Sequence, residues 1–170
     1  MKNFAILFVA VLLFASCSQS KIGYVDVEEL MKEYDATKAM EVQLKIEQEL
    51  MTKTFDSISA PFQVKVQAYY QKANKMSAKS RQTKEQELQQ EQQALQARQQ
   101  QIQQSLQLKG KEGIESLTKT VDSIVESYAI ANKYSLILGT QSTGTVMYGE
   151  DQINLTETIL DILNADFEEK

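Results

Sequence analysis

The sequence lacks the residues that most enzymes and metal sites require. It contains no histidine, one cysteine and one proline among 170 residues. Histidine is the commonest metal ligand and the commonest general base, so its absence argues against both kinds of site. A single cysteine excludes a disulfide bond within one chain. The sequence also has no nucleophile elbow and no glycine-rich phosphate loop. We therefore expect no catalytic residue, no metal site and no cofactor.

The charge of the chain is negative. Eighteen basic and 23 acidic residues leave a formal net charge of −5 at pH 7. Binding to the phosphate backbone of nucleic acids relies on many lysine and arginine residues. The composition therefore predicts that nucleic acid is not a partner.

A glutamine-rich stretch dominates the middle of the chain. Residues 84–107 contain no glycine, proline or aromatic residue, and large aliphatic side chains recur there every seventh position, at Leu88, Leu95 and Ile102. This spacing is typical of a solvated helix that presents one thin apolar seam to a partner helix. The pattern predicts a coiled-coil rod.

The first residues have the pattern of an export signal. A short basic start is followed by an unbroken apolar run of 11 residues from Phe4 to Phe14, which is too short to span a bilayer as a helix. Ala15 and Ser16 come directly before Cys17, the only cysteine. This pattern resembles the lipobox of bacterial lipoproteins, with Phe14 where leucine is usual, and it implies cleavage before a lipidated Cys17. The alternative is an ordinary signal peptide in which Cys17 is incidental.

Two long helices are expected on either side of a polar reversal. The first, from about Thr37 to Met76, carries apolar residues at steps of mainly three and four, and the second runs from about Lys84 to Asn132. A short turn between the helices, within residues 74–83, implies an antiparallel hairpin. Pro61 should bend the first helix or break it into two. The expected seam of the first helix is Met40, Leu44, Met51, Phe55, Ile58, Phe62, Val66, Tyr69, Ala73 and Met76.

Short β-rich segments stand at both ends of the expected hairpin. Residues 21–26 alternate in the period of a strand and lead, through Asp26 and Glu29 as a capping box, into a short helix. Residues 134–139 and 144–149 are two further β-rich runs, and Asn154 with Glu157 is a second capping box before a terminal helix. The elements at the two chain ends should therefore form one small body.

The order of these elements resembles the periplasmic chaperone family of Skp, also called OmpH-like. The segments that carry the resemblance are KIGYVDVEELMKEY near the start and YSLILGTQSTGTVMYGEDQINLTETILDILN near the end. The resemblance implies a mainly α fold, with a long antiparallel coiled-coil hairpin projecting from a β-rich oligomerisation body. It also implies a homotrimer without catalytic residues that holds unfolded outer-membrane proteins in the periplasm without ATP and prevents their aggregation.

The resemblance and the patterns together divide the chain. Residues 1–16 are expected to be the signal peptide, 17–21 a lipidated N-terminus and linker, 22–36 with 133–170 the oligomerisation body, and 37–132 the hairpin arm. A membrane anchor through Cys17 would hold this body close to the membrane surface. A structural lipoprotein that serves as an envelope spacer or scaffold is the alternative function.

Two groups of residues are candidates for contact with partners. Flexible methionine and amphipathic aromatic side chains suit promiscuous binding of apolar segments, although they could simply pack the hairpin seam. A group of basic residues could attract acidic clients or anionic lipid, although it could be a merely solvated turn. The client-binding candidates are Phe62, Tyr69, Tyr70 and Met76, and the basic tip consists of Lys72, Lys75, Lys79, Arg81 and Lys84.

Lipidation at Cys17 can be tested directly. We expect cells that express the chain to incorporate radiolabelled palmitate into it, and the Cys17→Ala variant to incorporate none. Equal labelling of the two proteins, or no labelling of either, would show that Cys17 is not the anchor.

Overall fold

The computed structural model describes residues 20–140, 146 and 148–169. Cys17 and the export signal lie outside these residues. The chain divides into two units. One comprises the described residues before Asp35 together with those from Val121 onward, and the other comprises Asp35–Thr120. The helix α4 (Ala78–Ala131) runs from the second unit into the first.

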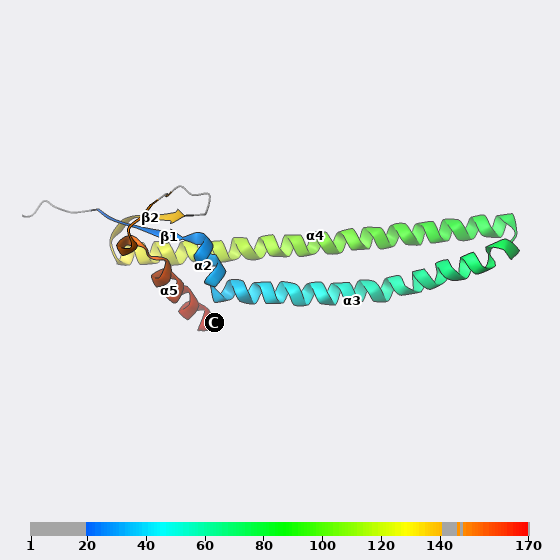
Figure 1. Ribbon diagram of the computed structural model, residues 1–170, viewed down its shortest axis with the longest axis horizontal. Helices are drawn as coiled ribbons and strands as arrows, with labels where there is room; N and C mark the ends of the chain where they lie inside the picture. The colour runs from blue at the N-terminus through cyan, green and yellow to red at the C-terminus, as the bar shows by residue number, and fades with distance from the viewer. Residues whose placement is uncertain (1–19, 141–145, 147, 170) are drawn as a thin grey trace, which may run out of the picture. The chain divides into compact units, whose positions relative to one another are not determined.

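The second unit is a helical hairpin. Its helices are α3 (Asp35–Lys72) and the part of α4 that ends at Thr120, connected by a single 3-10 turn, η1 (Ala73–Lys75). Two ion pairs join the helices: Lys65 lies 2.7 Å from Glu91, and Lys109 lies 2.6 Å from Glu47. As residue numbers rise along α3, those of their partners fall along α4. The helices are therefore antiparallel, as the sequence predicted (Figure 1).

The boundaries of the reversal differ from those expected. α3 ends four residues earlier than Met76, and α4 begins six residues earlier than Lys84. The earlier start has a local cause, because the Ser77 hydroxyl accepts a hydrogen bond from the Ser80 backbone N–H at 3.3 Å and caps the first turn. The chain therefore reverses direction within residues 73–77.

α3 continues through Pro61 without a break. The expected seam residues of this helix are half-buried or buried, except Ile58, which is exposed. Ser59 takes the half-buried place instead. Both positions lie three or four residues from Phe55 and Phe62, so helical spacing alone fits either one, and only packing against α4 selects Ser59.

Two glycines of α4 face side chains near the start of α3. A Cβ atom at Gly113 would overlap the sulfur of Met40, whereas a Cβ atom at Gly110 would lie 3.8 Å from a methyl carbon of Leu44. The Met40 side chain therefore occupies the space that a side chain at residue 113 would take. α4 is continuous through both glycines.

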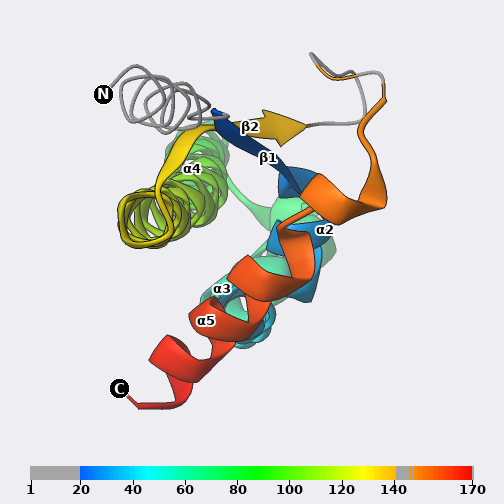
Figure 2. The ribbon, with the colours of Figure 1, turned by 90° about the vertical axis from the view of Figure 1, so that its left-hand side faces the viewer.

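The first unit joins segments that are far apart in the sequence (Figure 2). The strand β1 (Lys21–Asp26) pairs with β2 (Tyr134–Thr140) in parallel, and β1 leads directly into α2 (Val27–Glu33). The Asp26 carboxylate accepts a hydrogen bond from the Glu29 N–H at 3.0 Å, which confirms Asp26 as the cap. The Asp26 N–H donates to Thr156 instead of to Glu29, so the predicted capping box is only half formed. The core contains Val25, Leu30, Tyr34, Val121, Leu155, Ile159 and Leu163.

Half of the predicted run 144–149 lies outside the described residues. Only residues 146, 148 and 149 of this run are described, and they are not in a strand; the partner of β2 is β1. β1 belongs to the N-terminal part of the chain, far from β2 in the sequence. The sequence next to β2 therefore does not reveal which strand pairs with it. A 3-10 turn, η2 (Asp151–Ile153), precedes the final helix, α5 (Thr156–Glu168), and the Asn154 side chain accepts from the N–H of Thr156 at 2.9 Å rather than from that of Glu157.

The Thr156 hydroxyl links the final helix to β1. Its oxygen accepts a hydrogen bond from the Asp26 backbone N–H at 2.8 Å, and the hydroxyl donates to Asn154 Oδ1 at 2.6 Å. The Leu155 N–H donates to the Tyr24 carbonyl at 2.8 Å. Thr156 is buried, so these bonds form where water cannot replace them.

The two glycines of the hairpin allow a matched test of interhelical packing. Gly110→Ala should stabilise the chain by about 0.5–1 kcal/mol, because alanine has the higher helix propensity and its methyl group meets ordinary contacts. Gly113→Ala should be about 1 kcal/mol less stable than Gly110→Ala, because its methyl group displaces Met40. Urea denaturation followed by circular dichroism measures both. Equal free energies of unfolding for the two variants would contradict the overlap with Met40.

Candidate functional site

Three of the four client-binding candidates lie in one groove near the reversal of the hairpin. Phe62, Tyr69 and Tyr70 line a groove of about 370 Å³ together with Val66, Glu85, Leu88, Gln89 and Gln92. The tyrosine rings are neighbours, with centroids 5.5 Å apart. The groove therefore combines aromatic and aliphatic side chains with the amides of α4.

The two tyrosines of this groove have different environments. Tyr69 is 8% exposed and faces α4, whereas Tyr70 is 72% exposed. The Tyr69 hydroxyl donates a hydrogen bond to the Glu85 carboxylate. Tyr69 therefore packs the seam between the helices, and Tyr70 offers a large amphipathic surface to a partner.

The hydrogen bond between Tyr69 and Glu85 changes the acidity of the phenol. Because the carboxylate accepts the phenolic proton, the bond raises the pKa of Tyr69 above its ordinary value of 10.0, and burial of the ring acts in the same direction. The neutral phenol is thus the form that holds the helices together.

Met76 lies with the basic tip. It lines one groove of about 400 Å³ with Lys79 and Lys84, and another of about 220 Å³ with Lys72 and Lys84. The second of these grooves is also lined by Tyr69, which therefore borders both Met76 and the groove of Phe62.

The basic tip surrounds the start of α4. Lys72 ends α3, Lys75 belongs to η1, and Lys79 and Arg81 stand in the first turns of α4, which have no acidic residue at their start. The N-terminus of a helix carries a partial positive charge, so cations at this end add to the field instead of balancing it. Among these residues Lys84 is paired, at 2.6 Å from Glu87. The tip is thus a concentrated positive region on an acidic chain.

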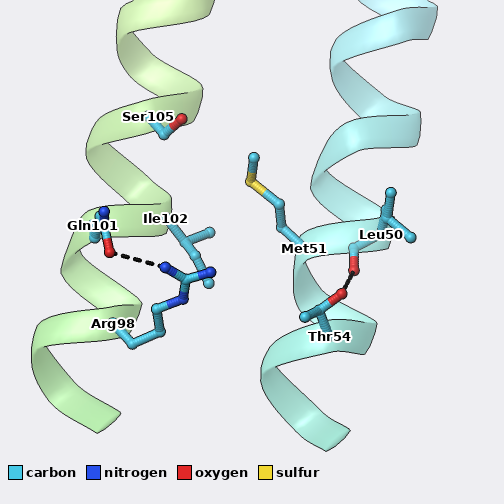
Figure 3. Close-up of a pocket in the computed structure, with 7 residues that line it drawn as sticks. All are labelled: Leu50, Met51, Thr54, Arg98, Gln101, Ile102 and Ser105. Carbon is cyan, nitrogen blue, oxygen red and sulfur yellow. Dashed lines mark hydrogen bonds between the residues drawn. The ribbon is translucent and has the colours of Figure 1, made fainter. Parts of the chain in front are cut away.

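A further groove lies in the middle of the hairpin, where the sequence predicted no site. It has a volume of about 270 Å³, and Figure 3 shows Met51, Ile102 and the end of Arg98 between the helices. α3 contributes aliphatic and thioether groups, and α4 contributes a guanidinium group beside an aliphatic one. The lining residues are Leu50, Met51, Thr54, Arg98, Gln101, Ile102 and Ser105.

An exposed aliphatic ridge on α3 leads to the rim of this groove. Val42, Ile46 and Leu50 follow one another at intervals of four residues and are all more than half exposed. Side chains four residues apart lie on one side of a helix. The spacing of four residues is visible in the sequence, but it does not show by itself that these side chains are exposed.

The described residues show neither a metal site nor a membrane span. Across residues 20–140, 146 and 148–169, no group of three or more cysteine and acidic side chains could hold a metal ion. Within the same residues, no helix combines the length and the apolar character needed to cross a bilayer.

The architecture combines an antiparallel helical hairpin in one unit with a small two-stranded sheet in the other. Residues 21–163 match the model of the family described as "Outer membrane protein (OmpH-like)". The match covers most of the chain, so the chain belongs to the OmpH-like family. None of the curated proteins matches it.

The fold also matches a solved structure. The crystal structure of a protein described as a "putative outer membrane chaperone (OmpH-like)" from Caulobacter crescentus CB15 superposes with a TM-score of 0.77 at 14% sequence identity. The alignment covers 89% of this chain and 88% of the other. The structures therefore share their fold over nearly their whole lengths.

The raised pKa of Tyr69 predicts a distinct titration. In a spectrophotometric titration we expect one of the seven tyrosines to ionise above pH 10, and this late step to be missing in Tyr69→Phe. The contribution of the bond to stability should be complete below pH 10 and disappear as the pH rises through the raised pKa. Tyr70→Phe serves as the matched control and should keep the late step. If the late ionisation step persists in Tyr69→Phe, another tyrosine causes that step.

Proposed function

We propose that this chain is an ATP-independent holdase chaperone of the cell envelope, which binds unfolded outer-membrane proteins in the periplasm and prevents their aggregation. Membership of the OmpH-like family supports a chaperone type of role. The observation that carries the finer proposal is the hairpin, which exposes aliphatic and aromatic side chains along its length, at Val42, Ile46, Leu50 and Tyr70. Exposed apolar surface of this kind is typical of an interaction site.

The sheet supports the proposal that the working form is a homotrimer. Parallel sheets are normally buried, and a sheet of two strands is marginal by itself. Here β1 and β2 form a two-stranded parallel sheet with three exposed aliphatic residues, at Ile22, Leu136 and Leu138. Leu136 is 48% exposed although it lies in the middle of β2. Association with further copies would extend the sheet and cover these side chains.

The basic tip and the aromatic groove have separate roles in this proposal. The cations around the start of α4 attract acidic segments of a client, and steering of this kind acts over a distance of about 10 Å at 0.1 M salt. Tyr70 and Phe62 then contact apolar segments. A lipid on Cys17 keeps the chaperone at a membrane, where its clients arrive.

A membrane-tethered spacer is the second candidate, favoured by the length of the hairpin. α3 has 38 residues and α4 has 54, so each helix extends more than about 50 Å at 1.5 Å per residue. A spacer, however, does not require an exposed aliphatic ridge or an aromatic groove. An aggregation assay separates the two candidates.

The decisive experiment uses the chain from Ser18 onward, which contains every described residue. We expect light scattering to give three times the mass of one chain, and the protein to suppress the turbidity that follows dilution of a urea-unfolded outer-membrane protein. Leu136→Asp should dissociate the trimer, because a carboxylate would be buried in the interface. Glu157→Asp, a surface change on α5, is the control and should remain trimeric. A monomeric mass together with undiminished turbidity would overturn the proposal.

A further inference from the structure

The middle groove of the hairpin contains the only charge in a long neutral stretch. Between Glu91 and Lys109 every residue of α4 except Arg98 is uncharged. Arg98 is also one of only two arginines in the sequence, the other being Arg81. The glutamines already make this part of the helix soluble in water. Solvation of the helix therefore does not explain why one guanidinium group stands here.

Arg98 has no acidic partner in the described part of the chain. The other cross-hairpin cations, Lys65 and Lys109, each pair with a glutamate. Arg98 instead donates one hydrogen bond, from Nη1 to the side-chain oxygen of Gln101 at 3.0 Å (Figure 3). This neutral acceptor belongs to the same helix, one turn away. A carboxylate is a stronger partner for a guanidinium group, because it accepts two parallel charge-assisted hydrogen bonds.

The surroundings of the guanidinium group are apolar. Figure 3 shows Arg98 lying beside Ile102 on α4, with the Met51 side chain extending from α3 toward α4. Met51 and Ile102 are half-buried, and Leu50 at the rim is 63% exposed. A ligand in this groove would meet aliphatic and thioether groups on one side and a cation on the other. Apolar surroundings also strengthen an ion pair that forms there, because they lower the local dielectric constant.

We propose that this groove is a binding site for an extended polypeptide segment in which a carboxylate stands next to an apolar side chain. The carboxylate pairs with Arg98, the apolar side chain lies between Leu50 and Ile102, and the flanking residues continue along the ridge of Val42 and Ile46. The inference rests on the proposed chaperone function and specifies the chemistry of the segments that the middle of the hairpin selects. Charge complementarity is the reason for this choice of ligand. Arg98 carries a positive charge without an acidic partner among the described residues, so it favours a ligand that has a carboxylate.

Fluorescent peptides test the site on the chain from Ser18 onward. The probe is an extended peptide of serine and leucine with one central aspartate, and its matched forms have asparagine or lysine at that position. By fluorescence anisotropy, the unmodified chain should bind the aspartate peptide about fivefold more tightly than the asparagine peptide, as expected for one partly exposed ion pair. Increasing salt should reduce this preference.

Substitutions assign the preference to a residue. Arg98→Gln should bind the aspartate and asparagine peptides equally, and Arg98→Glu should prefer the lysine peptide. Lys111→Gln, which removes an exposed cation of α4 that belongs neither to the basic tip nor to the grooves described above, should keep the aspartate preference of the unmodified chain. Leu50→Ser should weaken both peptides alike without changing their ratio. Circular dichroism establishes that each variant keeps its helix content.

The outcomes separate this inference from the proposed function. If the aspartate preference persists in Arg98→Gln, or is lost equally in Lys111→Gln, the groove is not the site. A change of mass in Arg98→Glu would show that a second copy of the chain occupies the groove, which also overturns the inference. Suppression of aggregation by the unmodified chain without any peptide preference would refute the inference alone. Absence of both activities would refute the chaperone function itself.

Discussion

Every surface that the hairpin offers to a partner depends on how α3 and α4 hold each other. Their contact is a single row of half-buried side chains, supplemented by the ion pairs of Lys65 with Glu91 and Lys109 with Glu47. So narrow a contact buries little apolar surface per residue. It also leaves most of each helix in contact with water, and this is why Val42, Ile46, Leu50 and Tyr70 remain available.

The first unit holds together two parts of the chain that are far apart in the sequence. Backbone hydrogen bonds between β1 and β2 do part of this, and the buried Thr156 hydroxyl ties the start of α5 to the end of β1. The fully buried Leu30, Ile159 and Leu163 then form a small core. The exposed side chains of β2 are the part of this unit that lacks cover in one chain, and the proposed trimer would provide it.

Electrostatics distinguish the surfaces of an otherwise acidic protein. Cations gather around the start of α4, where the helix dipole adds to their field, and a single arginine stands in the neutral middle of the same helix. Most remaining lysines with a described partner are neutralised by nearby carboxylates, as Lys119 is by Glu115. A partner with acidic segments would therefore meet two positive positions along one helix, separated by neutral amides.

Local pattern in the sequence determined the helices, β1 with its cap at Asp26, and the antiparallel hairpin, because the seven-residue and 3.6-residue periods are properties of neighbouring residues. It also identified Phe62, Tyr69 and Tyr70, which share one groove. Only the tertiary structure decided that β2 pairs with β1, that Ser59 replaces Ile58 in the seam, and that Arg98 lies beside Met51 and Ile102. All three features depend on contacts between residues far apart in the chain. No local sequence pattern encodes such contacts.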